Sequence, residues 1–378
     1  MCVVVASRRS DSLLQFTMSE PEEGEIVEET PAQQKRRRTS KSKPERVFSL
    51  PPGFPLADRF FVEEGIALGS QGQVYRCKDR QADNDVAVKV MTGSSSKKVM
   101  QLEQQVLVKV SAKREFPGLV QHGSFIFNDS KGHFVAMELL GKDLGFIVSL
   151  DQFPLDLLAK VGKHMLYAIQ SLHSCAFVHR DVCFENFMVR DKNFKAIDSI
   201  CLIDFGLSKM FTPALDNIPP AGEFRGNKMY ASLNAHHGLQ LSMRDDLLSL
   251  FLMLCHRVFG YLPWGPHESL DEIRRKKEKF FSRLLKENHT ETKRIPDPLL
   301  NFFKLVQPLT FNDIPDYHAL AACLDELGSN PETSVSNAVE VSSPALRSRV
   351  NFVFEPCVSS FVAEEPLLGS QEKSRNSS

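Results

Sequence analysis

Two side chains that suit phosphoryl transfer stand five residues apart near the middle of the chain. Asp181 and Asn186 lie in Phe177–Val189, which reads FVHRDVCFENFMV. On one short rigid loop, a carboxylate can accept a proton from an attacking hydroxyl while an amide oxygen holds a divalent metal ion. An apolar, helix-like run precedes the loop, so the loop has a scaffold. The tripeptide His179-Arg180-Asp181 occurs often by chance, so it is informative only with partners at the right distance.

Two glycines upstream have the spacing of a phosphate-binding turn. Ile66–Tyr75 reads IALGSQGQVY, with Gly69 and Gly72 three residues apart and Val74 two further on. This pattern suits a strand–turn–strand that lays backbone N–H groups over phosphates, although a plain hairpin turn would have the same pattern. A dinucleotide-binding glycine motif would open a helix, whereas the residues that follow read as two more strands.

A lysine and two carboxylates complete the set. In the strand predicted over Val86–Met91, Ala87 and Lys89 face one side and the valines the other. A lysine flanked by valines in a central strand needs a buried anion, and the alternative is a lysine at a sheet edge. Glu103, in the middle of a helix predicted over 97–111, can face Lys89. Asp204 ends a short apolar strand and precedes Phe-Gly, so it can reach a metal ion held by Asn186.

Together these positions fill the roles that transfer of a phosphoryl group requires. The two glycines would let backbone approach the phosphates, and Lys89, oriented by Glu103, would hold the α- and β-phosphates. Asp181 would accept the proton of the substrate hydroxyl, and Asn186 and Asp204 would hold Mg²⁺. This reaction needs little beyond positioning and charge neutralisation, so we expect these five residues to be catalytic, with ATP and Mg²⁺ as cofactors.

The hydrophobic pattern predicts an α+β fold with two lobes. Strand patterns at Leu119–Phe127 and His133–Leu140 complete a small β-rich N-terminal lobe over 58–141. From Pro154 the pattern is helical, and Asp245–Phe259 is apolar nearly all round, as in a buried central helix. The helical C-terminal lobe is expected over 142–327, with its last two helices at 299–306 and 317–327.

The two ends of the chain are predicted to be disordered tails, over 1–54 and 328–378. The first contains an acidic stretch, Glu20–Glu29, and a basic run, Lys35–Lys43, with few large apolar residues nearby. The basic run is either a nuclear-import signal or a solvated segment that folds back on an acidic surface. We therefore expect the protein in the cytoplasm and the nucleus.

Composition excludes several other classes. The chain has 378 residues, 42% of them apolar, and a formal net charge of -1, which predicts no nucleic-acid partner. No apolar run reaches the roughly 18 residues needed to cross a bilayer, so no membrane partner is expected. The eight cysteines are scattered without a CxxC pair, which predicts reduced, buried thiols rather than a zinc site. We expect a monomer.

Three further stretches carry a family resemblance. The first is Met137-Glu138-Leu139-Leu140-Gly141, which precedes the helical lobe. The second is Ser232-Leu233-Asn234, and the third is residues 309–317, which read LTFNDIPDY. With these stretches, residues 58–327 resemble the casein kinase I group of protein kinases. Within this group, the sequence from Glu223 to His236 is most similar to the tau-tubulin kinase branch.

The resemblance implies a bilobal kinase fold, ATP as phosphate donor and serine or threonine hydroxyls of proteins as acceptors. It places backbone contacts to adenine at Glu138 and Leu140, and a gatekeeper side chain at Met137. It also implies that Asp246 tethers the catalytic loop, although on sequence alone helix capping explains Asp246 equally well. The expected nucleotide-binding residues are Ala67, Gly69, Gly72, Val74, Ala87, Lys89, Met137, Glu138 and Leu140.

The chain departs from the family pattern around the catalytic loop. Cys183 replaces a lysine that contacts the γ-phosphate, and Phe184 replaces a proline beside it. Asn227 replaces a threonine that bonds the catalytic aspartate. Met229 replaces an arginine associated with acidic or phosphate-primed substrates, and Ala67 replaces the first glycine of the loop.

These departures leave two functions open. An active serine/threonine kinase with reduced activity is favoured by Lys89, Asp181 and Asp204, whereas a nucleotide-binding pseudokinase scaffold is favoured by Cys183 and Asn227. If the chain is active, its substrates are expected to be acidic or phosphate-primed proteins. The run Arg274–Lys277 could then supply basic surface in place of the missing arginine.

Overall fold

The computed structural model describes residues 49–69, 72–92, 96–149, 154–191, 199–213, 222–286 and 295–329. Most of both predicted tails, including the basic run, lies outside these ranges. Within the described ranges, no helix is both long and apolar enough to span a membrane.

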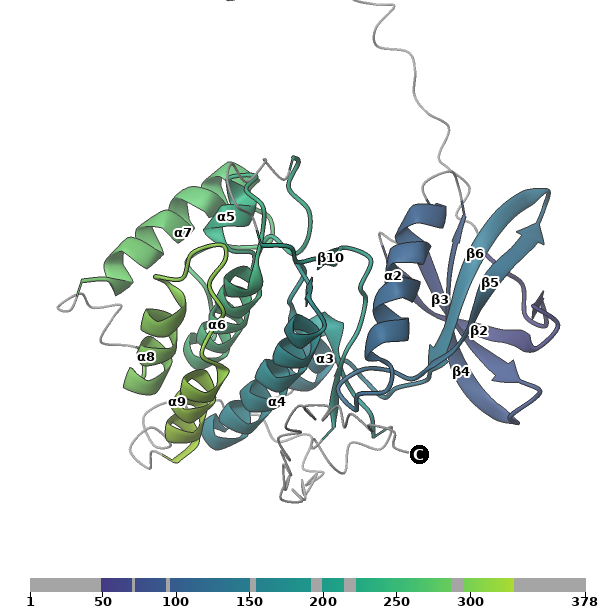
Figure 1. The fold of residues 1–378 in the computed structure, drawn as a ribbon, viewed down its shortest axis with the longest axis horizontal. Helices are drawn as coiled ribbons and strands as arrows, with labels where there is room; N and C mark the ends of the chain where they lie inside the picture. Colours follow the sequence, from purple (N-terminus) through teal and green to yellow (C-terminus); the bar gives the residue numbers. More distant parts are fainter. Residues whose placement is uncertain are drawn as a thin grey trace, which may run out of the picture. The chain divides into compact units, whose positions relative to one another are not determined.

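The N-terminal lobe is an antiparallel sheet with one helix packed against it (Figure 1). The strands lie in the order β1-β2-β3-β4-β6-β5. The helix, α2 (Ser96–Val110), contacts β4, β5 and β6. The strand bounds are β1 Pro55–Leu56, β2 Phe60–Gly69, β3 Gly72–Asp79, β4 Asn84–Thr92, β5 Leu119–Phe127 and β6 Ser130–Glu138.

The central strand β4 explains why the sheet holds a lysine in its interior. Val86, Val88 and Val90 are at most 1% exposed on one face, and Ala87 and Lys89 are buried on the other. β-Branched residues favour the pleated strand, and burial on both faces produces the nearly continuous apolar run. The predicted alternation in this strand is confirmed, and the alternative of an edge lysine is wrong because β3 and β6 flank β4.

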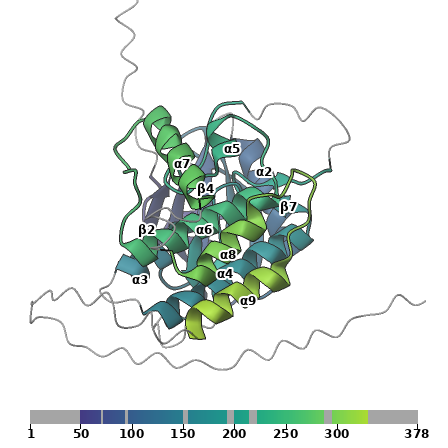
Figure 2. The ribbon, with the colours of Figure 1, turned by 90° about the vertical axis from the view of Figure 1, so that its left-hand side faces the viewer.

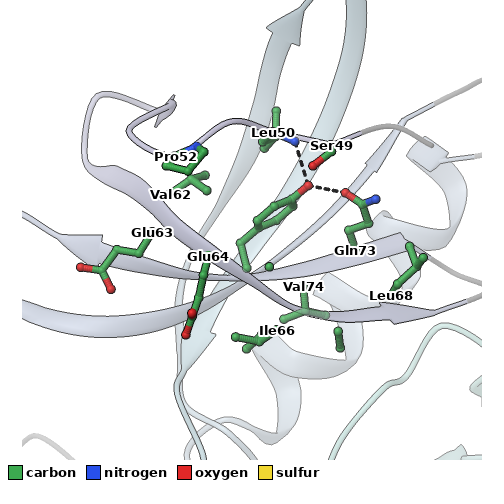
Figure 3. Close-up of a pocket in the computed structure, with 13 residues that line it drawn as sticks. Ser49, Leu50, Pro52, Val62, Glu63, Glu64, Ile66, Leu68, Gln73 and Val74 are labelled. Atoms are coloured by element: carbon green, nitrogen blue, oxygen red, sulfur yellow. Dashed lines mark hydrogen bonds between the residues drawn. The ribbon is translucent and has the colours of Figure 1, made fainter. Parts of the chain in front are cut away.

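The packed part of the chain begins earlier than the sequence predicted. The tail was expected to reach residue 54, but Leu50 is 3% exposed and its N–H donates to the Tyr75 hydroxyl at 2.8 Å (Figure 3). Gly53 N–H donates to the carbonyl of Val62, whose own N–H donates to Phe54. This segment borders a cavity of about 420 Å³ over β2 and β3. The expected boundary was wrong because these contacts are made with residues distant in the sequence. The segment is also too short to show a periodic pattern of apolar residues.

The C-terminal lobe is helical, and four of its helices lie side by side, α4 and α6 with α8 and α9 (Figure 2). The short strands β7–β10 and the 3₁₀ turn η1 lie between helices α4 and α5. The bounds are α3 Leu144–Ser149, α4 Leu155–Ser174, β7 Phe177–Val178, η1 Phe184–Asn186, β8 Phe187–Val189, β9 Ile200–Leu202, β10 Lys209–Met210, α5 Leu233–His236, α6 Met243–Phe259, α7 Leu270–Leu284, α8 Asp297–Val306 and α9 Tyr317–Ser329.

Helix α6 is the buried core of this lobe, as its all-round apolar pattern predicted. Residues Leu250–Cys255 are all fully buried. A capping box between Ser242 and Asp245 begins the helix, and Gly260, at φ +75°, ends it in the left-handed conformation that glycine adopts without strain. The predicted α+β fold, with a sheet-based N-terminal lobe and a helical C-terminal lobe, is confirmed.

Candidate active site

Lys89 joins the two lobes at the centre of the site. Its Nζ atom lies 2.9 Å from Oε2 of Glu103 on α2 and 2.8 Å from Oδ1 of Asp204, which follows β9. Lys89 is 6% exposed and Glu103 is 1% exposed, so this contact is shielded from water. The contact between Lys89 and Glu103 confirms the prediction that Glu103 faces Lys89, whereas the contact between Lys89 and Asp204 was not predicted.

The charges in this cluster fix its protonation. Burial alone would lower the pKa of Lys89, but the carboxylates of Glu103 and Asp204 outweigh burial and raise it to about 12. Burial would raise the pKa of Asp204, yet the ammonium of Lys89 holds it below its ordinary value. At neutral pH the site therefore presents a charged lysine beside a charged aspartate.

The backbone is left-handed at two non-glycine residues beside this cluster. The φ angle is +60° at Asp204 and +71° at Arg180. Such conformations cost about 1–3 kcal/mol each and occur mostly at functional sites, where the surrounding structure holds them in place.

Asp246, at the start of α6, helps to hold the backbone at Arg180 in this conformation. Its Oδ2 accepts the N–H of His179 at 2.7 Å, and its Oδ1 accepts the N–H of Arg180 at 2.8 Å. The helix is instead capped by Ser242 with the neighbouring Asp245, whose Oδ2 accepts the N–H of Ser242 at 2.8 Å. Of the two explanations left open for Asp246, the tether to the catalytic loop is the one that the geometry supports.

Asp181 and Asn186 lie on the loop that Asp246 holds. Asn186 Nδ2 donates to the carbonyl of Asp181 at 2.8 Å and to its Oδ2 at 3.3 Å. With its N–H groups used in this way, the amide oxygen of Asn186 is left to act as a metal ligand. Burial raises the pKa of Asp181 above its ordinary value, and the nearby charge of His179 offsets part of that rise.

Asn227 contacts Asp181 through its backbone rather than its side chain. The N–H of Asn227 donates to Asp181 Oδ1 at 2.7 Å, while its side-chain oxygen accepts the N–H of Met229 at 2.9 Å. The hydrogen bond that a threonine hydroxyl was expected to supply is therefore replaced by a backbone donor. Sequence reasoning missed this because every residue except proline carries that N–H.

A cavity of about 610 Å³ opens beside this cluster, a size typical of small-molecule sites. Of the expected nucleotide-binding residues, its walls include Ala67, Gly72, Val74, Ala87, Lys89, Met137, Glu138 and Leu140, and Glu103, Asn186 and Asp204 also line it. Gly69 pairs with Gly72 across the hairpin. Among the described residues that line the cavity, Asp181 is not included.

Gly72 has a packing role as well as its expected role near phosphates. Its φ is +130°, and a Cβ there would lie 2.4 Å from the carbonyl oxygen of Val90. Any larger residue would therefore push β3 away from β4.

The cavity wall also contains residues that the sequence analysis did not single out, namely Ile66, Leu68, Leu139, Gly141, Lys142, Asp143, Glu185, Met188 and Ile203. One of them had a usable signal, since Ile203 immediately precedes Asp204. Met188 lies in β8, whereas Asn186 ends the turn η1, so strand alternation does not relate the two side chains.

The cavity suits a nucleotide with its metal ion. Asn186 and Asp204 offer oxygen ligands, which Mg²⁺ prefers. Oδ1 of Asp204 is occupied by Lys89 and by the N–H of Gly206, and among the described residues no hydrogen bond to its Oδ2 is formed. The apolar walls match the flat face of a base.

Cys183 and Phe184 lie in the core below this site. Their exposed fractions are 4% and 3%, and the ring of Phe184 packs edge-on against Tyr230 at 5.9 Å. Burial, with the charges of Asp181 and Glu185, raises the pKa of the Cys183 thiol well above its ordinary value. The thiol is therefore neutral and supplies no charge at the position where a lysine was expected.

The basic run on α7 does not form one basic surface. Lys277 is fully buried, so its expected place on that surface was wrong. Lys276 pairs with Glu268 at 2.8 Å and Arg274 with Asp271 at 3.1 Å, while Arg275 is exposed. Lys277 faces the interior while Arg275 and Lys276 face solvent, because a helix turns by 100° per residue.

Comparison with known proteins agrees with this geometry. Residues 60–312 match the protein kinase domain family. A probable serine/threonine-protein kinase of Dictyostelium discoideum is 31% identical over 303 residues, which cover 78% of this chain and 59% of that protein. A putative casein kinase I of Caenorhabditis elegans is 29% identical over 288 residues, 72% of this chain and 81% of that protein.

A probable casein kinase I homologue of Encephalitozoon cuniculi is 30% identical over 278 residues, 69% of this chain and 82% of that protein. The chain belongs to the protein kinase family. Its kinase domain is of the serine/threonine type, and these comparisons give no support to the pseudokinase scaffold.

Proposed function

We propose that this chain transfers the γ-phosphate of ATP, with Mg²⁺, to serine and threonine hydroxyls of protein substrates. The observation that carries the proposal is the double contact of Lys89 with Glu103 and Asp204 at the wall of a nucleotide-sized cavity. This contact places a fixed positive charge beside a free carboxylate oxygen, which is the arrangement that phosphate and its metal ion require.

Each residue then has a defined task. Lys89 binds the phosphates, and Glu103 orients the lysine. Asn186 and Asp204 hold Mg²⁺, which neutralises charge on the phosphates when bound. Asp181, held by Asn186 and by the N–H of Asn227, accepts the proton of the acceptor hydroxyl. The backbone at Glu138 and Leu140 binds the base.

The enzyme is a slow one in this proposal. Charge develops on the γ-phosphoryl oxygens in the transition state, and a positioned donor there is typically worth about 10²–10³ in rate. The buried, neutral thiol of Cys183 provides no such donor. Lys89 and the metal ion still neutralise much of the charge, so activity is reduced rather than lost.

Acidic or phosphate-primed proteins are the proposed substrates. Arg180 lies close to both Arg225 and Lys209. Burial and the charge of Arg225 lower the pKa of Arg180, against Asp246, which raises it, and burial and the charge of Arg180 lower the pKa of Lys209. Lys209 donates to the neutral amide of Gln240. This group of three cations favours an anionic substrate group, even though Met229 has replaced the expected arginine.

The chain is further proposed to belong to the tau-tubulin kinase branch. The stretch that suggested this branch is compact in the structure, because the ring of Phe224 stacks on His236 at 5.0 Å. Ser232 and Asn234 both donate to Asp245, at 2.6 and 2.9 Å, and so join the stretch to α6.

Transfer of labelled γ-phosphate to an acidic protein substrate, followed by phosphoamino-acid analysis, tests the proposed function. The expected product is phosphoserine or phosphothreonine, and Asp181→Asn should remove it while leaving nucleotide binding intact. Nucleotide binding without any labelled product in the wild type would instead support the scaffold.

We also propose that the protein is a monomer and that Lys35–Arg38 directs part of it into the nucleus. Changing these four residues to Ala in a fluorescent fusion should slow nuclear entry. An unaltered rate and an unaltered nuclear-to-cytoplasmic ratio would reject this role. The rate is needed because a 42.6 kDa protein also enters slowly by diffusion.

A further inference from the structure

Lys277 is a buried lysine with three polar partners and no carboxylate. It lies on α7, fully buried. Its Nζ donates to the carbonyls of Lys228 at 2.9 Å and Ala231 at 2.6 Å, and lies 3.1 Å from Nε2 of His236. Among the described residues it forms no ion pair, so its task is hydrogen bonding rather than charge pairing.

The three partners satisfy the amine in either charge state. An ammonium has three N–H donors, which match two carbonyls and the lone pair of His236. Burial lowers the pKa of Lys277 well below its ordinary value. A neutral amine would still donate to both carbonyls, and its lone pair would accept a hydrogen bond from the Nε2–H of His236. Both states therefore hold the same two backbone groups.

Those two groups belong to the segment that follows Asn227. The indole N–H of Trp264 donates to the carbonyl of Met229 at 2.9 Å, so Trp264 and Lys277 bind three of the four carbonyls of residues 228–231. The Nζ of Lys277 also lies 5.3 Å from the centre of the Trp264 ring. Lys277 and Trp264 together fix the path of this backbone.

The same backbone reaches the catalytic aspartate. The N–H of Ala231 donates to the carbonyl of Asn227 at 3.0 Å, and the N–H of Asn227 donates to Asp181 Oδ1 at 2.7 Å. There is little slack at this point, since a Cβ on Gly226 would lie 2.8 Å from the carbonyl oxygen of Arg180. A shift of the segment therefore moves a hydrogen bond on Asp181.

We propose that Lys277 is a positioning residue for phosphoryl transfer, which holds the backbone of 228–231 so that Asn227 keeps Asp181 in place. This inference rests on the proposed function. It concerns a residue that the sequence placed on a substrate-binding surface, and it assigns that residue to the interior. A misplacement of about 1 Å at a reacting group can cost on the order of 100-fold in rate.

The test compares Lys277→Met, which keeps the length of the side chain and removes its donors, with Lys279→Met, an exposed lysine of the same helix. We expect kcat to fall about 10- to 100-fold in Lys277→Met, with the dissociation constant and stoichiometry of MgATP binding unchanged. Amides 226–231 should exchange hydrogen faster than in the wild type. Lys279→Met should match the wild type, and Lys277→Gln, which keeps two donors, should recover part of kcat.

A merely structural role predicts a different result, because loss of folded protein lowers kcat and the stoichiometry of MgATP binding together. A parallel fall of kcat and of binding stoichiometry in Lys277→Met would overturn the proposal. So would a failure of both Lys277→Met and Lys277→Gln to fold, and so would an unchanged kcat. If the wild type transfers no phosphate, the proposed function fails, while hydrogen exchange at 226–231 still decides whether Lys277 holds the segment.

Discussion

The ammonium of Lys89 lies 2.8 Å from a carboxylate oxygen of Asp204, although 115 residues separate them in the sequence. One belongs to the central strand of the sheet and the other follows a strand of the helical lobe. Both residues line one cavity. In the proposed function, this contact joins the lysine that binds phosphate to the aspartate that binds the metal ion, across the two lobes.

Restoring the missing cation should make the enzyme faster. We predict that Cys183→Lys raises kcat by about 10- to 100-fold with the KM for ATP little changed, because the new charge acts mainly in the transition state. Phe184 packs tightly beside this position, so Cys183→Lys with Phe184→Pro should be measured in parallel. If neither variant turns over faster than the wild type, another residue already supplies the charge. Arg225 is the candidate to test next.

Activity should not depend on phosphorylation of the segment after Lys209. Thr212 is the only hydroxyl residue between Lys209 and Met229, and it is exposed and early in the segment. Kinases that are ordered by a phosphate place it where the catalytic-loop arginine can pair with it. Phosphatase treatment should leave kcat unchanged. A large loss on treatment that Thr212→Ala reproduces would refute this prediction.

The positions of the proposed catalytic residues around one site could be predicted from sequence because their spacing is local or follows strand and helix periods. Asp181 and Asn186 share one loop, and Lys89 stands out among valines. Leu50 could not be predicted, since its burial depends on a contact with Tyr75 that no local pattern encodes.

Lys277 was misplaced despite a signal in the sequence. It stands four residues after Ile273 and three before Phe280, both buried, and so belongs to the apolar stripe of α7. The run of charges around it obscured that spacing. The sequence did not show which of Asp245 and Asp246 caps the helix and which tethers the catalytic loop. The side chains of adjacent helical residues point in directions 100° apart, and only the position of the catalytic loop shows which one faces it.

The cluster of Arg180, Lys209 and Arg225 should decide substrate preference. We predict that Arg225→Ala raises the KM of a phosphate-primed peptide about tenfold, because a hydrogen bond to a charged group contributes about 1.5–3 kcal/mol. The KM of an unprimed peptide should not change. Arg275→Ala, an exposed arginine on α7, is the matched control. A larger effect of Arg275→Ala than of Arg225→Ala would place the anion site on α7 instead.

Removing the charge of Asp246 should loosen the catalytic loop. Asp246→Asn leaves one of two buried N–H donors, on His179 or Arg180, poorly paired, so we predict a loss of about 1–3 kcal/mol in the free energy of unfolding at pH 7. Urea unfolding measures it. Asp271→Asn, at an exposed ion pair, should cost less than about 1 kcal/mol.

The stability difference between the wild type and Asp246→Asn should depend on pH in a defined way. Burial would raise the pKa of Asp246, but hydrogen bonding and the charge of His173 hold it below its ordinary value. A lowered pKa contributes stability that is present above the ordinary aspartate pKa of about 3.9 and is lost as pH falls through the folded value. The difference between wild type and Asp246→Asn should therefore be the same at pH 7 and pH 5. A difference that disappears by pH 5 would contradict the assignment.

The most direct test of the account is the rate of γ-phosphate transfer by Lys89→Met and Asp204→Ala, measured at saturating MgATP on protein whose circular dichroism matches the wild type. Lys131→Met, an exposed lysine of the same sheet, is the control. Each of the two variants should lose at least about 10²–10³ in rate, while the control should keep the wild-type rate. Undiminished transfer by either variant would contradict the assignment of this site as the catalytic centre.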